Sequence, residues 1–210
     1  YAVSDYGGGK TAAVRSESDL TGRLSKMFDQ AQREVASGFV GMAGTPIVGD
    51  SAEKGRRWTF QNVLGALVKT WDEHGRQFRA EYDNLHRPIS AFVQQAGQAE
   101  ILFNYVVYGE HLGPATAQTL NLLGTTHLIF DQAGMVRVPQ LDFKGNPKSV
   151  DRILAKDYKN DLDWSALPGQ ADVAAIQVNA DPALETAEVF TAGSLYDALN
   201  RPTWVTMPDG

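Results

Sequence analysis

The chain has 210 residues, of which 43% are hydrophobic and 21% charged, and it contains no cysteine. This length suits one well-buried domain, alone or with an extension. The lack of cysteine excludes disulfides, thiolate metal sites and cysteine nucleophiles. A formal net charge of −6 without a long basic run argues against nucleic acid or an anionic membrane as partner. No apolar run approaches the roughly 20 residues that span a bilayer, so we expect a soluble protein without a transmembrane segment.

The first fifteen residues are small, polar and rich in glycine, and we interpret them as an N-terminal arm. The chain begins at Tyr1 rather than at methionine. Two explanations stay open, namely trimming of the chain or removal of a targeting segment. The second would place the protein in an organelle or an exported compartment.

Apolar residues recur at helical spacing in two segments of the N-terminal half. They predict a helix over residues 16–35 and a second helix over residues 59–75. The glycine-rich residues 38–55 between them break any period. We predict a loop there that folds back as a lid or a plug.

The period changes to two after the second predicted helix. Alternating apolar and polar residues predict strands at residues 78–83 and 89–94. Residues 99–108 are apolar on both faces and predict a central strand. Residues 120–130 and 135–143 flank a turn-like segment and predict a hairpin.

The C-terminal part gives weaker patterns. Ser149 is a candidate N-cap for a short helix that reaches Leu154. Residues 173–178 predict a strand, and Asp181-Pro182 predicts the entry to a helix. We identify no internal repeat in the chain.

Two helices followed by an antiparallel meander predict the α+β class, with the helices covering one side of a curved sheet. We expect three parts: an arm over residues 1–15, a domain over residues 16–158 and a C-terminal extension over residues 159–210.

Two strings support a resemblance. Residues 108–113, Tyr-Gly-Glu-His-Leu-Gly, resemble the segment that closes the long strand in some SnoaL-type polyketide cyclases. Residues 126–136 resemble the hairpin that follows it, with His127 opening an apolar strand. Together with the element order, they make residues 16–158 similar to the SnoaL-like branch of the NTF2-like superfamily. The resemblance implies a cone-shaped antiparallel sheet covered by N-terminal helices.

The same resemblance implies a catalytic pair. Asp142 falls near the place of the family's acid–base aspartate, where it would move a proton next to a carbonyl. His127 would position the substrate or stabilise an enolate oxygen. If the turn pairs Asp131 with Gly134, His127 lies opposite Val138. The binding candidates comprise two polar residues on the face of His127 and four aromatic residues for the cone lining, namely Thr125, Gln140, Trp71, Tyr82, Phe103 and Tyr105.

No cofactor or metal is expected. No two histidines stand at metal-ligand spacing with a carboxylate. The chain also lacks a nucleophile-elbow serine and a dinucleotide-binding glycine loop after a strand.

Two functions remain open at this point. The first is a cofactor-free cyclase, isomerase or dehydratase acting on an apolar carbonyl compound. The alternative is a non-catalytic binding or scaffold subunit, docked in a larger assembly through its terminal extensions, because fold alone does not decide function. The partners expected are accordingly a small apolar ligand, a second copy of the chain, or the other subunits of a complex.

Overall fold

The structure, a computed structural model, describes residues 2–5 and 11–208, and the side chains from residue 13. The described residues form fifteen strands, and strands that are neighbours in the sheet are also neighbours in the sequence. The chain forms two compact units. Unit 1 comprises Tyr1–Ala80 and Gln94–Ala99, and unit 2 comprises Glu81–Val93 and Glu100–Gly210. Within the described residues, the structure contains no helix with the length and apolarity needed to cross a membrane.

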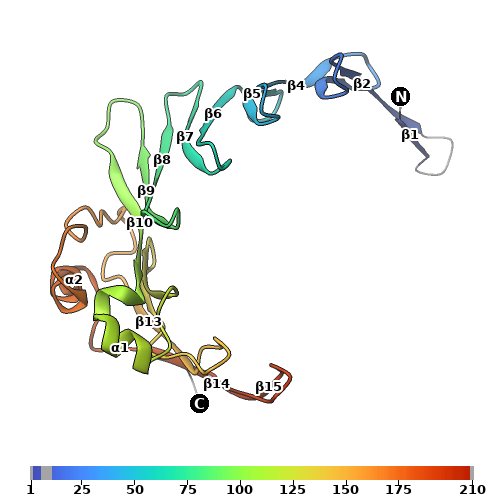
Figure 1. The fold of residues 1–210 in the computed structure, drawn as a ribbon. Coiled ribbons are helices and arrows are strands. Elements are labelled where there is room, and N and C mark those ends of the chain that lie inside the picture. Colours follow the sequence, from blue (N-terminus) through green and yellow to red (C-terminus); the bar gives the residue numbers. More distant parts are fainter. Residues whose placement is uncertain (1, 6–10, 209–210) are drawn as a thin grey trace. The chain divides into compact units, whose positions relative to one another are not determined.

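Unit 1 is a meander of β-hairpins in which each strand pairs antiparallel with its neighbour in the chain (Figure 1). Its strands, the last of which ends in unit 2, are β1 (Ala2–Asp5), β2 (Thr11–Ser18), β3 (Leu24–Phe28), β4 (Glu34–Val40), β5 (Pro46–Ser51), β6 (Arg57–Gln61), β7 (Leu67–Asp72) and β8 (Gln77–Tyr82).

Unit 1 has no hydrophobic core of its own in the part that the structure describes. Asp72 is the only buried residue there, and apolar side chains on the strands stay half-buried or exposed. Trp58 and Trp71 stack across β6 and β7 with ring centroids 6.3 Å apart, yet Trp71 keeps 37% of its surface exposed. Both faces of this sheet are therefore open to contact.

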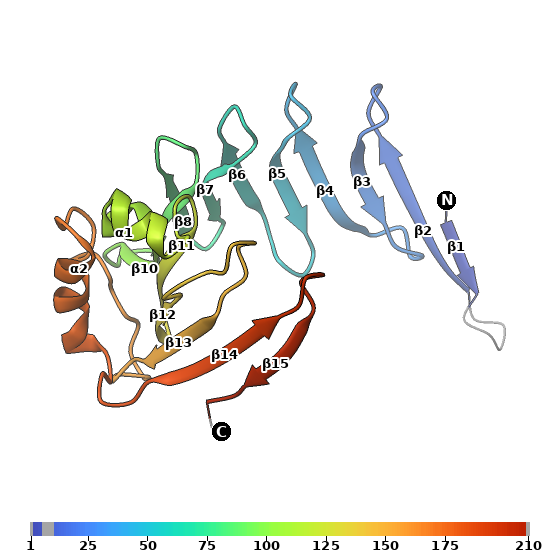
Figure 2. The same cartoon turned by 60° about the horizontal axis from the view of Figure 1, so that its bottom comes forward.

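Unit 2 continues the antiparallel pattern with longer connections (Figure 2). Between its strands lie a 3₁₀ turn and helix α1, and later helix α2 with a second 3₁₀ turn. The elements are β9 (Pro88–Gln94), β10 (Ile101–Tyr108), η1 (Gly109–Leu112), α1 (Pro114–Thr119), β11 (Thr126–Asp131), β12 (Gly134–Arg137), β13 (Ser149–Leu154), α2 (Val173–Ala180), η2 (Asp181–Ala183), β14 (Phe190–Tyr196) and β15 (Pro202–Thr206).

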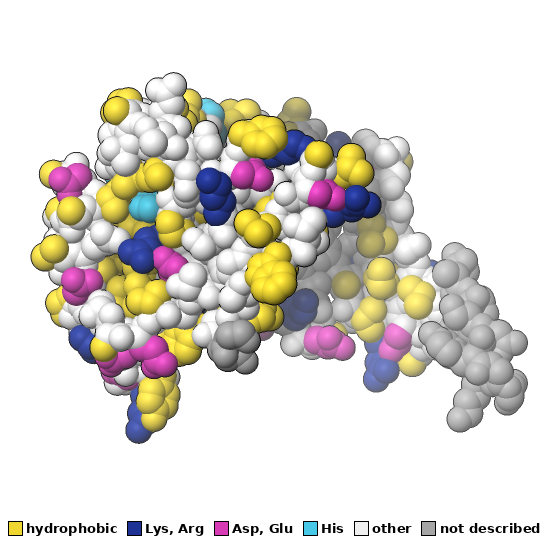
Figure 3. All heavy atoms as spheres, turned by 90° about the horizontal axis from the view of Figure 1, so that it is seen from below, with side chains coloured by type: hydrophobic (Ala, Val, Ile, Leu, Met, Phe, Trp, Pro, Cys, Tyr) yellow, Lys and Arg dark blue, Asp and Glu magenta, His cyan; other side chains and the backbone are white. Residues whose placement is uncertain are grey.

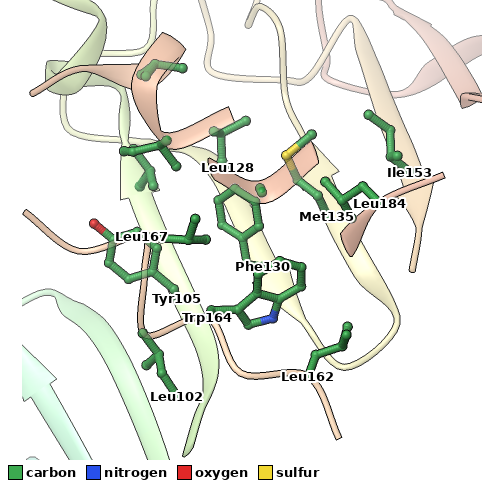
Figure 4. Packing of buried hydrophobic residues seen from close by; sticks show 14 residues of the cluster. Leu102, Tyr105, Leu128, Phe130, Met135, Ile153, Leu162, Trp164, Leu167 and Leu184 are labelled. Carbon is green, nitrogen blue, oxygen red and sulfur yellow. The ribbon is translucent and has the colours of Figure 1, made fainter. Parts of the chain in front are cut away.

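The core of unit 2 forms where the connection between β13 and β14 folds over the sheet. Phe130 on β11 and Tyr105 on β10 lie opposite each other, and Met135 on β12 continues the row. From the connection, Trp164 packs against Phe130 with ring centroids 5.2 Å apart, and Leu167 is fully buried beside them (Figure 4). We call residues 156–189 the cap, because it supplies the second layer that this sheet needs.

The expected α+β cone is wrong. The predicted helix over residues 16–35 is replaced by parts of β2 and β4 with β3 between them, and the one over residues 59–75 by β6 and β7. The predicted loop at residues 38–55 lies largely within the β4–β5 hairpin. Most of the regular structure is strand, and the described residues before Gly109 contain no helix that could cover the sheet.

Of the predictions for residues 78–154, the strands and the hairpin are confirmed and the helix is wrong. The strands at residues 78–83, 89–94 and 99–108 are confirmed as β8, β9 and β10. The hairpin around residues 131–134 is also confirmed, with Asp131 opposite Gly134, although its strands are shorter than predicted. The helix from Ser149 is wrong, because β13 occupies those residues.

Two further corrections concern the C-terminal part. The strand at residues 173–178 is wrong, because α2 begins there with the Asp172 carboxylate accepting from the Ala175 N–H. Asp181-Pro182 enters only the short turn η2. The predicted boundaries after residues 15 and 158 are not tested and stay predictions. Part of the predicted arm, residues 1 and 6–10, lies outside the described residues.

Candidate functional site

One five-residue turn recurs along both units. The first residue's N–H donates to the fifth carbonyl, and the fourth N–H donates back to the first carbonyl. The first side chain, aspartate or asparagine, accepts from the fifth N–H through Oδ1. The fourth residue always has φ between 60° and 87°. The turns are residues 19–23, 29–33, 62–66, 72–76, 83–87, 142–146 and 197–201.

This recurrence corrects the expectation that the chain has no internal repeat. The string Asp-x-x-Gly-Arg occurs at residues 19–23 and 72–76, and variants with Gln32, His86 or Asn200 in the fourth place keep the terminal aspartate and arginine. In four of the turns the arginine Nε donates to the aspartate Oδ2 at 2.7–2.8 Å. This signal is present in the sequence, and it marks the turns at residues 19–23, 29–33, 72–76, 83–87 and 197–201.

Charges accordingly occur as local pairs. On the face shown in Figure 3, basic and acidic side chains lie beside each other rather than in separate areas. At the turn of Asp72, burial raises the pKa of the carboxyl, but hydrogen bonds from the Arg76 backbone and guanidinium outweigh it and hold the pKa below its ordinary value. Each such pair neutralises itself within its turn.

Arg87 in unit 2 makes the most contacts of these arginines. Its Nε lies 2.7 Å from Asp83 Oδ2, its Nη1 lies 3.0 Å from Glu110 Oε1, and its Cζ lies 3.8 Å from the centre of the Tyr108 ring. Glu110 also accepts from the Gly124 N–H at 3.0 Å. The cluster ties the β8–β9 turn to the segment after β10, so part of the predicted family string has a structural role.

The cap is fixed to the sheet by polar contacts as well as by packing. Gln132 donates to the Leu162 carbonyl and accepts from the Leu162 N–H, both at 2.8 Å. Trp164 donates from Nε1 to the Asp131 carbonyl at 3.1 Å, and its backbone N–H donates to the Leu102 carbonyl at 2.9 Å. The sequence did not predict these hydrogen bonds, because a single glutamine or tryptophan carries no pattern.

The two predicted catalytic residues lie in different local settings. His127 lies opposite Val138, as predicted, and its imidazole is buried with Nδ1 2.9 Å from the Val138 carbonyl oxygen. Burial lowers the pKa of His127. Asp142 opens a turn, where its carboxylate accepts from the Lys144 N–H and from the Asn146 side chain and N–H.

The proton affinity of Asp142 differs from what acid–base catalysis requires. The Asn146 hydrogen bonds hold the pKa of Asp142 below its ordinary value, whereas a carboxyl that donates a proton near neutral pH needs a raised pKa. The catalytic role of the pair stays a prediction.

The predicted binding residues are spread over the two units. Trp71 belongs to unit 1, where it borders a surface depression of about 160 Å³ together with Arg57 and Phe78. In unit 2, Tyr105 is buried against Phe130 in the core. The remaining four are half-buried at the end of β8, on β10, before β11 and after β12, namely Tyr82, Phe103, Thr125 and Gln140.

Comparison with known proteins identifies the fold. No protein family and no curated protein matches the sequence. The crystal structure of TcdB2-TccC3 matches with a TM-score of 0.83 and 19% identity over 98% of this chain. A Tc holotoxin pore of Photorhabdus luminescens with a mutation in TccC3 matches with a TM-score of 0.81 and 20% identity over 98% of this chain. This chain spans 10% of the length of each matching chain.

These matches overturn the resemblance to SnoaL-like proteins. They run along nearly the whole chain, including the hairpins that were expected to be helices. Since the identity is near 20%, the likeness shows the fold and leaves the function to separate argument.

Proposed function

We propose that this chain is a structural part of a larger β-sheet assembly. The observation that carries the proposal is the exposure of unit 1, in which Asp72 is the only buried residue among those described. Burial of apolar surface is the main driving force of folding. A sheet that buries almost nothing therefore depends on surfaces supplied from elsewhere.

The strands of unit 1 carry the apolar side chains that such surfaces would cover. Exposed apolar residues occur on every strand from β2 to β8, namely Val14, Leu24, Phe39, Ile47, Phe60, Leu67, Trp71 and Phe78. Scattered exposed apolar residues are normal, but a whole sheet of them is characteristic of interaction sites. Unit 2 differs, because its cap already covers its core.

The comparisons support this proposal at the level of architecture. The matching structures are assemblies by their own description, TcdB2-TccC3 and a Tc holotoxin pore, and this fold is a tenth of their matching chains. A role as a scaffold segment agrees with the alternative left open by the sequence. The docking of terminal extensions is the finer part of that alternative and stays a proposal.

Hydrogen–deuterium exchange on two samples tests the proposal. One sample is the 210-residue chain alone, and the other is the protein isolated in its native form from its source. We expect unit 1 amides to exchange fast in the isolated chain and slowly in the native sample, because covered sheet opens less often. The amides of β11, in the core of unit 2, serve as the internal reference.

Two observations together would contradict the proposal. If the isolated chain protects unit 1 as strongly as β11, and the native protein sediments as a single chain, the assembly proposal fails. An acid–base enzyme would then regain interest, and Asp142→Asn in a turnover assay would be the next step.

A further inference from the structure

The turns of unit 1 sort onto two opposite edges of its sheet. In an antiparallel meander, successive turns alternate between the two strand ends. Turns 19–23, 41–45 and 62–66 therefore share one edge, which we call the apolar turn row. The turns at the other edge, which we call the polar turn row, are residues 29–33, 51–56, 72–76 and 94–98.

Contacts between turns confirm this sorting within unit 1. In the apolar turn row, Arg23 Nη1 donates to the Gly41 carbonyl at 2.9 Å. In the polar turn row, the Glu73 N–H donates to the Arg56 carbonyl at 3.1 Å. A Cβ on Gly75 would stand 2.9 Å from Ala96 Cβ, which places the last two turns of that row together.

The two rows differ in what they expose. Leu20, Met42 and Val63 stand at the tips of the apolar turn row with relative exposures of 108%, 101% and 101%, and Leu64 adds 63%. The polar turn row presents no exposed large hydrophobic residue among the described residues. An apolar tip fully exposed in one turn would be unremarkable. Its repetition in the three turns of the apolar turn row, and its absence from the four described turns of the polar turn row, is a pattern.

Charge divides the rows in the same way. The polar turn row carries several charged residues, among them Asp29, Glu53, Lys54 and Arg76. The apolar turn row carries only Asp19 and Arg23. The Asp19 carboxylate accepts hydrogen bonds from the Thr21 N–H and hydroxyl and from the Arg23 N–H. The Arg23 guanidinium donates to the Gly41 carbonyl. The apolar turn row thus presents no charge in need of a partner.

We propose that the apolar turn row packs against an uncharged, apolar protein surface that runs along it. This inference rests on the proposed function. It adds which edge of unit 1 makes a contact and what kind of surface that edge contacts. Alternate hairpins lie roughly 10 Å apart at the usual strand spacing, so the three tips span about 20 Å. The partner surface must offer apolar contact over that length.

A membrane surface fits the row less well. Anionic lipid attracts lysine and arginine, and membrane interfaces favour tryptophan and tyrosine. The three turns contain Arg23 alone of these four residue types, and its guanidinium is already bonded to Gly41.

Unit 2 also has turns with exposed apolar tips. Turns 142–146 and 197–201 touch through Asn146 Nδ2 and Asn200 Oδ1 at 3.2 Å. Their tips expose Phe143 by 86% and Leu199 by 72%, whereas the opposite turn at residues 131–134 exposes no large hydrophobic residue. Exposed apolar tips therefore occur at turns of both units, while in unit 2 the β13–β14 connection also exposes Tyr158 by 83%.

Site-specific photocrosslinking tests the inference in the native assembly. The probe p-benzoylphenylalanine is placed at Leu20, Met42 or Val63 in turn. Matched controls carry it at Gln30, Glu53 or His74, which are exposed residues of the polar turn row. We expect several-fold higher crosslinking yield from the apolar turn row, with all three products mapping by mass spectrometry to uncharged apolar protein segments.

A triple variant, Leu20→Ser, Met42→Ser and Val63→Ser, provides a second measurement. It should fold as before by circular dichroism, since these side chains are fully exposed, and it should lose crosslinking through a probe at Leu64. Equal yields from both rows, products with lipid, or products with charged segments would each overturn the inference. If the native particle is an assembly and yet the yields are equal, the proposed function stands and only this inference fails. If the native protein is a single chain without crosslinks, both fail.

Discussion

At the scale of single residues, the turn aspartates explain why the hairpins are so regular. One carboxylate satisfies N–H groups that a tight turn would leave without a partner, and it also holds the arginine that ends the turn, just before the next strand. How much such a pair contributes depends on its exposure, because water screens open ion pairs. The turns of Arg87 and Arg33 represent the two extremes.

Arg87→Ala tests a partly buried pair. The side chain is 23% exposed and contacts Asp83, Glu110 and the Tyr108 ring. Its removal leaves two carboxylates without their cation, and we expect the free energy of unfolding to fall by about 2 kcal/mol. Urea denaturation followed by circular dichroism measures the change.

Arg33→Ala is the matched control, because Arg33 holds the same turn position with a side chain that is 79% exposed. We expect it to leave the free energy of unfolding nearly unchanged. Equal losses in the two variants would show that burial does not set the strength of these pairs.

The fourth turn position gives a prediction of opposite sign. His86 has φ 60°, a conformation that costs a non-glycine residue energy and that glycine adopts freely. His86→Gly should raise the free energy of unfolding by up to about 1 kcal/mol, less the added chain entropy of glycine. Thermal and urea midpoints measure it.

Gly75→Ala is the converse change at the same turn position. Gly75 has φ 77°, and an added Cβ would meet Ala96 at 2.9 Å. We expect a clear loss of stability. A gain from Gly75→Ala, or a loss from His86→Gly, would contradict the assignment of backbone strain to this position.

At the scale of elements, the cap decides whether unit 2 has a core. Trp164 is 3% exposed and combines packing on Phe130 with a hydrogen bond to the Asp131 carbonyl. Trp164→Phe keeps most of the packing and removes the donor. It should cost about 1–3 kcal/mol of unfolding free energy through the unpaired carbonyl.

Hydrogen exchange measures where in unit 2 the stability is lost. The Leu102 N–H, which donates to Asp163 in the cap, should lose protection in Trp164→Phe. Trp204→Phe is the control, since Trp204 is 65% exposed on β15. Loss of protection at Leu102 in both variants would argue against a specific role of Trp164.

The element scale also shows what the sequence could predict. The strands β8 to β10 and the turn at residues 131–134 were predictable, because alternation and buried apolar runs are direct signs of sheet. The predictions of helices over residues 16–35 and 59–75 were wrong for a physical reason. The repeated turns begin 10 or 11 residues apart, as at Asp19 and Asp29 or Asp72 and Asp83, and three helical turns take roughly 10.8 residues. Apolar residues placed by a hairpin repeat therefore imitate helical spacing.

The candidate site was predictable only in part. The pairing of His127 with Val138 follows from the turn alone. The role of Asp142 as a turn residue follows only when its string is compared with the other turns, since one Asp-x-x-Gly string has no meaning by itself. The cap contacts of Gln132 depend on a chain segment 30 residues away, beyond the reach of any local pattern.

At the scale of the whole chain, stability depends on pH through two kinds of group. The repeated turns hold the pKa of their aspartates below the ordinary value, as at Asp29, Asp142 and Asp197. A carboxyl with a lowered folded pKa stabilises the fold above its unfolded pKa, about 3.9, and loses this effect as the pH falls toward the folded value. The turns should therefore weaken together below about pH 4.

His127 affects stability at higher pH than the turn aspartates do. Burial lowers its pKa, so the unfolded chain takes up a proton near its unfolded pKa of about 6.5 while the folded chain stays neutral. Stability should fall as the pH drops from about 7 toward the folded pKa of His127. A plot of urea midpoint against pH should thus show two separate descents.

Two variants separate the descents. His127→Gln should remove the upper descent and leave the lower one, whereas Asp142→Asn should reduce the steepness of the lower descent alone, because one fewer carboxyl takes up a proton. Urea titrations at half-unit steps between pH 7.5 and 2.5 measure both. If Asp142→Asn instead steepens the descent near pH 6.5, the pKa of Asp142 lies far above its turn-bound value, because a carboxyl that binds its proton in the folded chain stabilises the fold as the pH falls. That outcome would reopen the acid–base role, because only a carboxyl with a raised pKa donates a proton in that range.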